Sequence, residues 1–165
     1  RFTVKLRYQD APFVSVPVEV SPQEAGNTDD ADWTHSPAFE LIGLPESGPI
    51  PCMTIPWQIA QKLHAVTAKL TDGRTNDRAH DLVDLQILRA LLVDESLVPV
   101  RQACVEVFEG RRQQAWPPTV TVLDHWPRIY TEALSSVENL GLAHDVEQAA
   151  MIVNLFIQQV DEAGA

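Results

Sequence analysis

The sequence predicts an α+β fold in which a small antiparallel or mixed sheet is packed on a bundle of about five helices. Two periodicities indicate this fold. Apolar and polar residues alternate along the first 20 residues, which is typical of β-strands. From Thr54 onward, apolar residues recur every three to four positions, which is typical of amphipathic helices. The chain has 165 residues and is 45% hydrophobic, which is enough for one compact core.

Two alternating runs at the start of the chain predict a β-hairpin. Their apolar positions are Phe2, Val4, Leu6 and Tyr8 in the first run and Val14, Val16, Val18 and Val20 in the second. Glu19 lies within the second run and is expected on the face opposite the valines, toward solvent or a polar cleft. Pro17 indicates an edge strand or a bulge, because proline has no backbone N–H to donate.

The segment after the hairpin has no periodicity. Residues 21–37 are rich in acidic and small polar residues and predict a long, mobile loop. A third short strand is expected over residues 39–44. These features divide the chain into a sheet region, residues 1–50, and a helical region, residues 51–165.

Capping and breaking residues delimit the helices. Thr54 and Pro56 open the first predicted helix, and Asp72-Gly73 ends it. Asn76 or Asp77 caps the second, which has a leucine seam. Further helices are expected over residues 97–112, 124–138 and 145–162.

Composition excludes several classes of protein. The net charge of −11 repels nucleic acid at long range, so any contact with RNA has to be local. The two cysteines show no metal-binding spacing and are expected to be reduced, which favours a cytoplasmic location. The chain has no apolar run long enough to cross a membrane. It begins at Arg1 within a strand-like pattern, and we expect it to be part of a larger protein.

The charged residues of the first two helices are the strongest functional signal. Lys62 flanks the apolar stripe of the first helix, and Asp77, Asp81 and Asp84 share one face of the second. Helix packing does not require these charges. Three structural explanations remain open: a lysine that extends its amine to solvent, carboxylates favoured at a helix start, and a salt bridge from Asp81 or Asp84 to Lys62, Arg74 or Arg78.

The runs QIAQKLHAVTAKL and NDRAHDLVDLQIL, preceded by a strand ending in VEVSP, resemble the C-terminal portion of the AbiEii/AbiGii-type nucleotidyltransferase toxins, which include the MenT toxins. The resemblance implies a polymerase-β-like fold. It also implies transfer of a nucleoside monophosphate from an NTP to an acceptor, often the 3′ end of tRNA. As a toxin of a toxin-antitoxin or phage-defence system, the protein would have a cognate antitoxin partner.

The resemblance also implies roles for individual residues. Glu19 matches a third metal-binding acid, Lys62 the lysine that holds the triphosphate, and Asp81 the acid of the later motif. Arg78 and Asp84 belong to that later motif and would assist nucleotide binding. Such a set suits phosphoryl chemistry, in which Mg²⁺ and fixed cations neutralise charge on the phosphates and the leaving pyrophosphate.

The chain departs from the family pattern at the metal site. The family's first two metal-bound acids lie in a GSx…DxD motif, and no Gly-Ser dipeptide precedes Glu19. Asp30-Ala31-Asp32 spells DxD but follows Glu19 and is expected to be a solvated acidic loop. One glutamate cannot hold Mg²⁺ by itself. We therefore expect Mg²⁺ binding only in the complete protein, and no catalysis by this chain alone.

Two other functions remain open. His64, His80-Asp81 and Asp124 follow the order H…HD…D of metal-dependent HD phosphohydrolases, although an HD dipeptide often occurs by chance. The more serious alternative is a non-enzymatic module of an inactive relative, whose helical half binds a partner protein. Convergence of Glu19, Lys62 and Asp81 in one open cleft would favour the nucleotide site over both.

Overall fold

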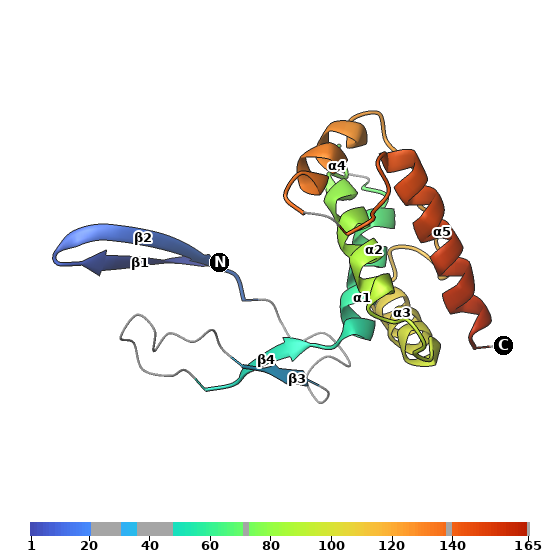
Figure 1. The fold of residues 1–165 in the computed structure, drawn as a ribbon, viewed down its shortest axis with the longest axis horizontal. Helices are drawn as coiled ribbons and strands as arrows, with labels where there is room; N and C mark the ends of the chain where they lie inside the picture. The colour runs from blue at the N-terminus through green and yellow to red at the C-terminus, as the bar shows by residue number, and fades with distance from the viewer. Residues whose placement is uncertain (21–30, 36–47, 71–72, 138–139, 165) are drawn as a thin grey trace.

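The computed structural model describes residues 1–20, 31–35, 48–70, 73–137 and 140–164. Within these ranges it contains two small antiparallel sheets, five α-helices and one 3₁₀ turn (Figure 1). The elements in chain order are β1 (Phe2–Tyr8), β2 (Ala11–Val18), β3 (Ala31–Thr34), β4 (Ile50–Met53), α1 (Ile55–Thr67), η2 (Arg78–His80), α2 (Asp81–Ala90), α3 (Val98–Arg111), α4 (Trp126–Leu134) and α5 (Val146–Glu162). The predicted α+β class with about five helices is confirmed.

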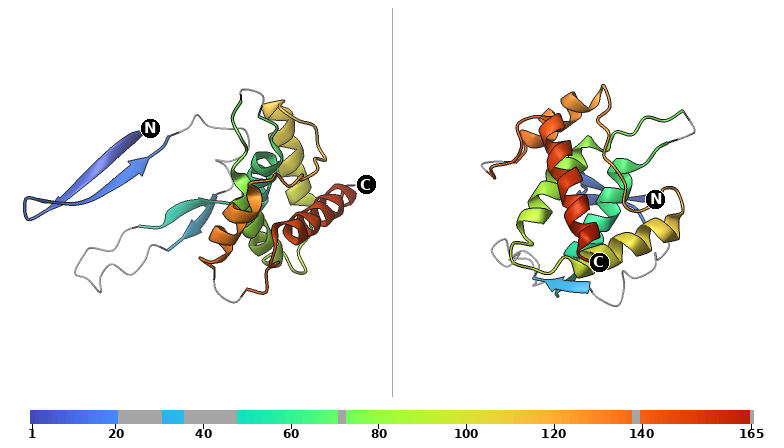
Figure 2. Two further views of the ribbon diagram at one scale, coloured as in Figure 1. Left: turned by 90° about the horizontal axis from the view of Figure 1, so that it is seen from above. Right: turned by 90° about the vertical axis from the view of Figure 1, so that its right-hand side faces the viewer.

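The helices form the hydrophobic core. Its buried residues extend from Ile59 to Val160, and the largest fully buried side chains include Trp126, Tyr130 and Phe108. α1 packs against α2 and α3, and α2 packs against α5. Figure 2 shows α5 crossing the face of this bundle. The described helices include none long and apolar enough to cross a membrane.

Three predicted helices are shorter in the structure. The second, with its predicted cap at Asn76 or Asp77, is α-helical only from Asp81, after the 3₁₀ turn η2. α1 ends at Thr67, before the predicted Asp72-Gly73, because Ala68 has an extended backbone. Leu70 therefore lies beyond the helix and is exposed. α4 begins at Trp126 and ends at Leu134, inside the predicted range 124–138. The last predicted helix agrees closely, since Asp145 caps α5 by accepting the N–H of Gln148 at 2.7 Å.

The strands form two separate sheets. β1 and β2 pair as the predicted hairpin, with Phe2 opposite Val18 and an irregularity between Leu6 and Arg7. β3 pairs with β4, which leads directly into α1. β3 occupies residues 31–34 of the segment predicted as a loop. The rest of that loop, apart from His35, and the expected strand at residues 39–44 lie outside the described residues.

The β1–β2 hairpin lies apart from the helices in Figures 1 and 2. Its apolar residues are exposed in both strands, including Phe2, Tyr8 and Phe13. The described helices therefore cover neither of its faces. The expected packing of a sheet on the helices is therefore not seen for this hairpin, because the buried core of the described residues is built without it.

Candidate functional site

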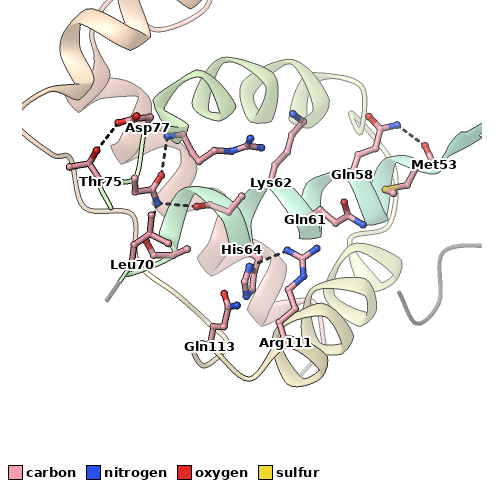
Figure 3. A pocket seen from close by; sticks show the side chains of 14 residues that line it. Met53, Gln58, Gln61, Lys62, His64, Leu70, Thr75, Asp77, Arg111 and Gln113 are labelled. Atoms are coloured by element: carbon pink, nitrogen blue, oxygen red, sulfur yellow. Dashed lines mark hydrogen bonds between the residues drawn. The ribbon is translucent and has the colours of Figure 1, made fainter. Parts of the chain in front are cut away.

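The candidate site lies where α1 meets the start of α2. Pro56 stands in the first turn of α1, where its fixed φ favours helix initiation. Lys62 follows in the middle of this helix, on the flank of a stripe that buries Ile59, Leu63 and Val66. Figure 3 shows the Lys62 side chain pointing from α1 toward α2.

Two carboxylates of α2 hold the ammonium group of Lys62. Its Nζ lies 3.0 Å from Oδ1 of Asp81 and 2.6 Å from Oδ2 of Asp84. The Asp81 side chain is completely buried, whereas the Asp84 side chain is 44% exposed. Asp81 and Asp84 are three positions apart on α2 and share one helix face. This cluster confirms the salt bridge that the spacing allowed.

A second cation contacts Asp81 from the 3₁₀ turn that leads into α2. Arg78 donates from Nε to Oδ2 of Asp81 at 2.6 Å, and the imidazole of His80 lies 3.7 Å from Oδ1. Both oxygens of this buried carboxylate therefore have a cationic partner, as burial of a charge requires. Asp81 fixes Lys62 and Arg78 relative to each other.

The carboxylates keep Lys62 charged. Partial burial lowers the pKa of Lys62, but the hydrogen bonds to Asp84 and Asp81 and the charges of both acids raise it more. The net effect is a pKa above the usual value of 10.5. The group is thus a permanent, fixed cation at neutral pH.

Lys62 and Arg78 line an open pocket of about 870 Å³. Gln58, Gln61 and Arg111 also line it, and Figure 3 shows the pocket along α1 between the start of α2 and the end of α3. Arg111 donates from Nη1 to Nδ1 of His64 at 3.2 Å. Because a guanidinium only donates, Nδ1 of His64 is the acceptor of this bond.

Sequence reasoning did not identify Arg111 as part of this pocket. It is the last residue of α3 and follows Lys62 by 49 positions, and nothing in its local sequence distinguishes it from Arg112. The neighbouring Arg112 lines a different pocket, near Glu109 and Trp116. Only the packing of α3 against α1 shows which arginine lines the pocket with Lys62.

The structure does not bring Glu19 to this cluster. Glu19 follows β2, and its Oε1 pairs with Nε of Arg1 at 3.1 Å, with both side chains mostly exposed. The expected convergence of Glu19, Lys62 and Asp81 is thus shown only for Lys62 and Asp81. The role implied for Glu19 stays a prediction.

The described residues form no complete site for a divalent metal ion. They contain no group of three or more His, Cys, Asp or Glu side chains arranged to hold one. Asp81 and Asp84 are occupied by Lys62 and Arg78, and Nδ1 of His64 accepts from Arg111. The alternative based on His64, His80-Asp81 and Asp124 therefore has no support in this geometry.

The fold is α+β, and Lys62 is held by two acids beside an open pocket. These features are compatible with a nucleotidyltransferase, and comparison with known proteins supports this class of protein. A family model described as "Nucleotidyl transferase AbiEii toxin, Type IV TA system" matches residues 1–152. No curated protein matches the chain. The chain belongs to the AbiEii family of nucleotidyltransferase toxins, as the sequence resemblance predicted.

Proposed function

We propose that this chain forms the triphosphate-binding half of a toxin that transfers a nucleoside monophosphate from an NTP to an acceptor such as tRNA. The observation that carries the proposal is the ammonium group of Lys62, fixed by Asp81 and Asp84 at the edge of the large pocket. A fixed cation can stabilise the negative charge that develops on a leaving pyrophosphate without having to reorganise.

The two acids have different roles in this proposal. Asp81 is completely buried and has two cationic partners, so it keeps Lys62 and Arg78 in place. Asp84 is partly exposed and contacts Lys62 from the solvent side. A phosphate oxygen of the NTP would take the place of the Asp84 carboxylate on Lys62. Arg78 would then contact the nucleotide with its remaining N–H groups.

Catalysis also needs a metal site. We propose that Glu19 is one Mg²⁺ ligand and that the other ligands are acids not encoded in these 165 residues, because the sequence has no GSx…DxD motif. The isolated chain is then expected to bind an NTP without transferring it. We place the complete toxin in the cytoplasm, with its NTP and tRNA substrates, and expect an antitoxin to bind it there.

Calorimetric titration of the chain with ATP, CTP, GTP and UTP tests the nucleotide site. The wild-type chain should bind at least one of them, and Lys62→Ala should weaken binding about tenfold or more, since a hydrogen bond between charged groups is lost. Lys69→Ala is the matched control, because Lys69 is exposed and does not line the pocket with Lys62. Equal effects of both substitutions, or no binding by the wild type, would contradict the proposal.

A nucleotide-transfer assay tests the expectation that the isolated chain is catalytically inactive. The chain is incubated with Mg²⁺, tRNA and NTPs labelled at the α-phosphate, and the expected result is no label on the tRNA. Incorporation above background would show that these residues suffice for catalysis. If the chain bound a partner protein but no NTP, the non-enzymatic interaction module would be the better account.

A further inference from the structure

Asn76 connects the two halves of the lysine cluster. This residue precedes η2 and is buried. Its Nδ2 donates to the backbone oxygens of Ala65 at 3.0 Å, Val66 at 3.3 Å and Ala68 at 2.9 Å. These carbonyl groups lie at the end of α1, where a helix runs out of backbone N–H partners, although the oxygen of Ala65 also accepts the N–H of Ala68 at 3.3 Å. The side chain thus caps the helix that carries Lys62.

The same side chain also fixes the turn that carries Arg78. Oδ1 of Asn76 accepts the backbone N–H of Arg78 at 2.9 Å. Ala65 is three residues after Lys62, and Asp81 is three residues after Arg78. The amide group of Asn76 therefore joins the backbone of α1, one turn after Lys62, to the backbone of Arg78.

α4 holds the backbone of Asn76 in place. Nε1 of Trp126 donates to the backbone oxygen of Asn76 at 2.6 Å, and the Trp126 side chain is buried. His125 lies 3.2 Å from the same oxygen and 2.9 Å from Oδ1 of Asp77. Three elements, α1, η2 and α4, thus meet at Asn76. Every polar atom of its side chain has a partner, which makes its position unusually well determined.

We propose that Asn76 is a positioning residue that sets the spacing between Lys62 and the Arg78–Asp81 pair. The importance of this role for the reaction rests on the function proposed above for Lys62. The reason is geometric: Lys62 and Asp81 lie on separate helices, and their hydrogen bond depends on the register between α1 and η2. The side chain of Asn76 is hydrogen-bonded to the end of α1 and to the first residue of η2.

The test observes Lys62 directly. Lysine labelled with ¹³C at Cε gives three NMR signals, because the chain contains only Lys5, Lys62 and Lys69. Asn76→Ser keeps an oxygen that can accept the N–H of Arg78 but removes the amide N–H groups that donate to the end of α1. We expect this variant to lower the titration midpoint of the Lys62 signal and to leave the other two signals unchanged. Val160→Ala is the control, since it removes a buried side chain from the core on α5, which carries no residue of the cluster.

A second variant keeps the test decisive if Asn76→Ser does not fold. Trp126→Phe preserves a buried ring but removes the donor to the backbone of Asn76, and it should shift the Lys62 signal in the same direction by a smaller amount. An unchanged Lys62 midpoint in the folded variants, or the same shift in Val160→Ala, would overturn the inference. NTP binding by the wild type and by Lys62→Ala is measured separately by calorimetry. An incorrect nucleotide-site proposal would change the calorimetric result, whereas an incorrect positioning role for Asn76 would change the NMR result.

Discussion

Asp81 and Asp84 are both aspartates that contact Lys62, but they differ in burial and therefore in their expected contribution to stability. Both contact Lys62, but Asp81 is fully buried and Asp84 is 44% exposed. A buried carboxylate that loses its partners is strongly unfavourable, whereas an exposed ion pair contributes little to stability. Asp81 therefore supports the structure of the site, and Asp84 is the acid that a ligand would displace in the function proposed above.

The first prediction compares these two acids. Asp81→Ala removes the shared partner of Lys62 and Arg78 and should lower the free energy of unfolding by about 2–3 kcal/mol, because both cations are partly exposed and recover some hydration. Asp84→Ala should cost less than about 1 kcal/mol. Urea unfolding followed by circular dichroism measures both. Equal losses would show that burial does not distinguish the two acids.

The second prediction concerns alkaline pH. The pKa of Lys62 is raised in the folded chain, so its contribution to stability is complete below pH 10.5, the ordinary value, and is lost as the pH rises through the higher folded pKa. Lys62→Met should therefore lose stability less steeply above that pH than the wild type. Burial also raises the pKa of Tyr130 and of the Cys104 thiol. Both groups are present in both proteins, so the difference between the two curves reports on Lys62.

Local sequence predicted part of this site and could not predict the rest. Lys62, Asp81 and Asp84 stand out because helical periodicity places their charges beside apolar stripes, and the family resemblance pairs them. The contribution of Arg111 depends on the packing of α3 against α1, which no local pattern encodes. The same holds for Asn76, which looks like an ordinary helix cap in the sequence. Its three bonds to α1 require the chain to return to the end of that helix.

At the scale of elements, a closed hydrogen-bond network joins α2 to α4. Gln86 donates from Nε2 to the hydroxyl of Tyr130 at 3.1 Å, and that hydroxyl donates to the backbone oxygen of Ala143 at 2.7 Å. The backbone N–H of Ala143 donates to Oε1 of Gln86 at 2.9 Å. All three groups are buried, so each bond prevents a desolvated polar atom from remaining unpaired.

The third prediction tests this network. Tyr130→Phe leaves the oxygen of Ala143 and one N–H of Gln86 without the hydroxyl, and it should lower the free energy of unfolding by about 1–2 kcal/mol. Thr131→Ala is the matched control. Its exposed hydroxyl donates to Pro127 within α4, so its removal should change stability by about 0.5 kcal/mol or less. Urea unfolding compares the two variants, and similar losses would contradict a special role for the network.

The helix boundaries show a limit of sequence patterns at this scale. The spacing of apolar residues predicted that the first helix continues past Leu70. In the structure α1 ends at Thr67, and Asn76 donates to the carbonyl groups of Val66 and Ala68 at this end. The end of α1 is thus set by a contact with a residue beyond it. In contrast, Asp145 caps α5 through its own sequence neighbour Gln148, and this boundary was predicted correctly.

At the scale of the whole molecule, the core and the hairpin are distinct. The buried hydrophobic residues of the described chain begin at Ile59. The β1–β2 hairpin has exposed apolar residues on both strands and lies apart from the helices (Figure 2). Alternation in the sequence predicted the pairing of its strands correctly. It could not predict which element, if any, packs on the hairpin. Alternation shows which residues share a face of a strand, but it does not identify the element that packs against that face.

The fourth prediction follows from this separation. An isolated two-stranded hairpin is at best marginally stable in water, so the amides of β1 and β2 should exchange with solvent within seconds in the isolated chain. The amides of α1, α2 and α5 become exposed only when the hydrophobic core unfolds, so they should exchange orders of magnitude more slowly. Hydrogen exchange followed by mass spectrometry measures both sets in one sample. Deletion of residues 1–20 serves as the control and should leave exchange in the helices unchanged. Equal protection of the hairpin and the helices would show that the hairpin is covered in solution, and its exposed apolar residues would then mark the covered surface.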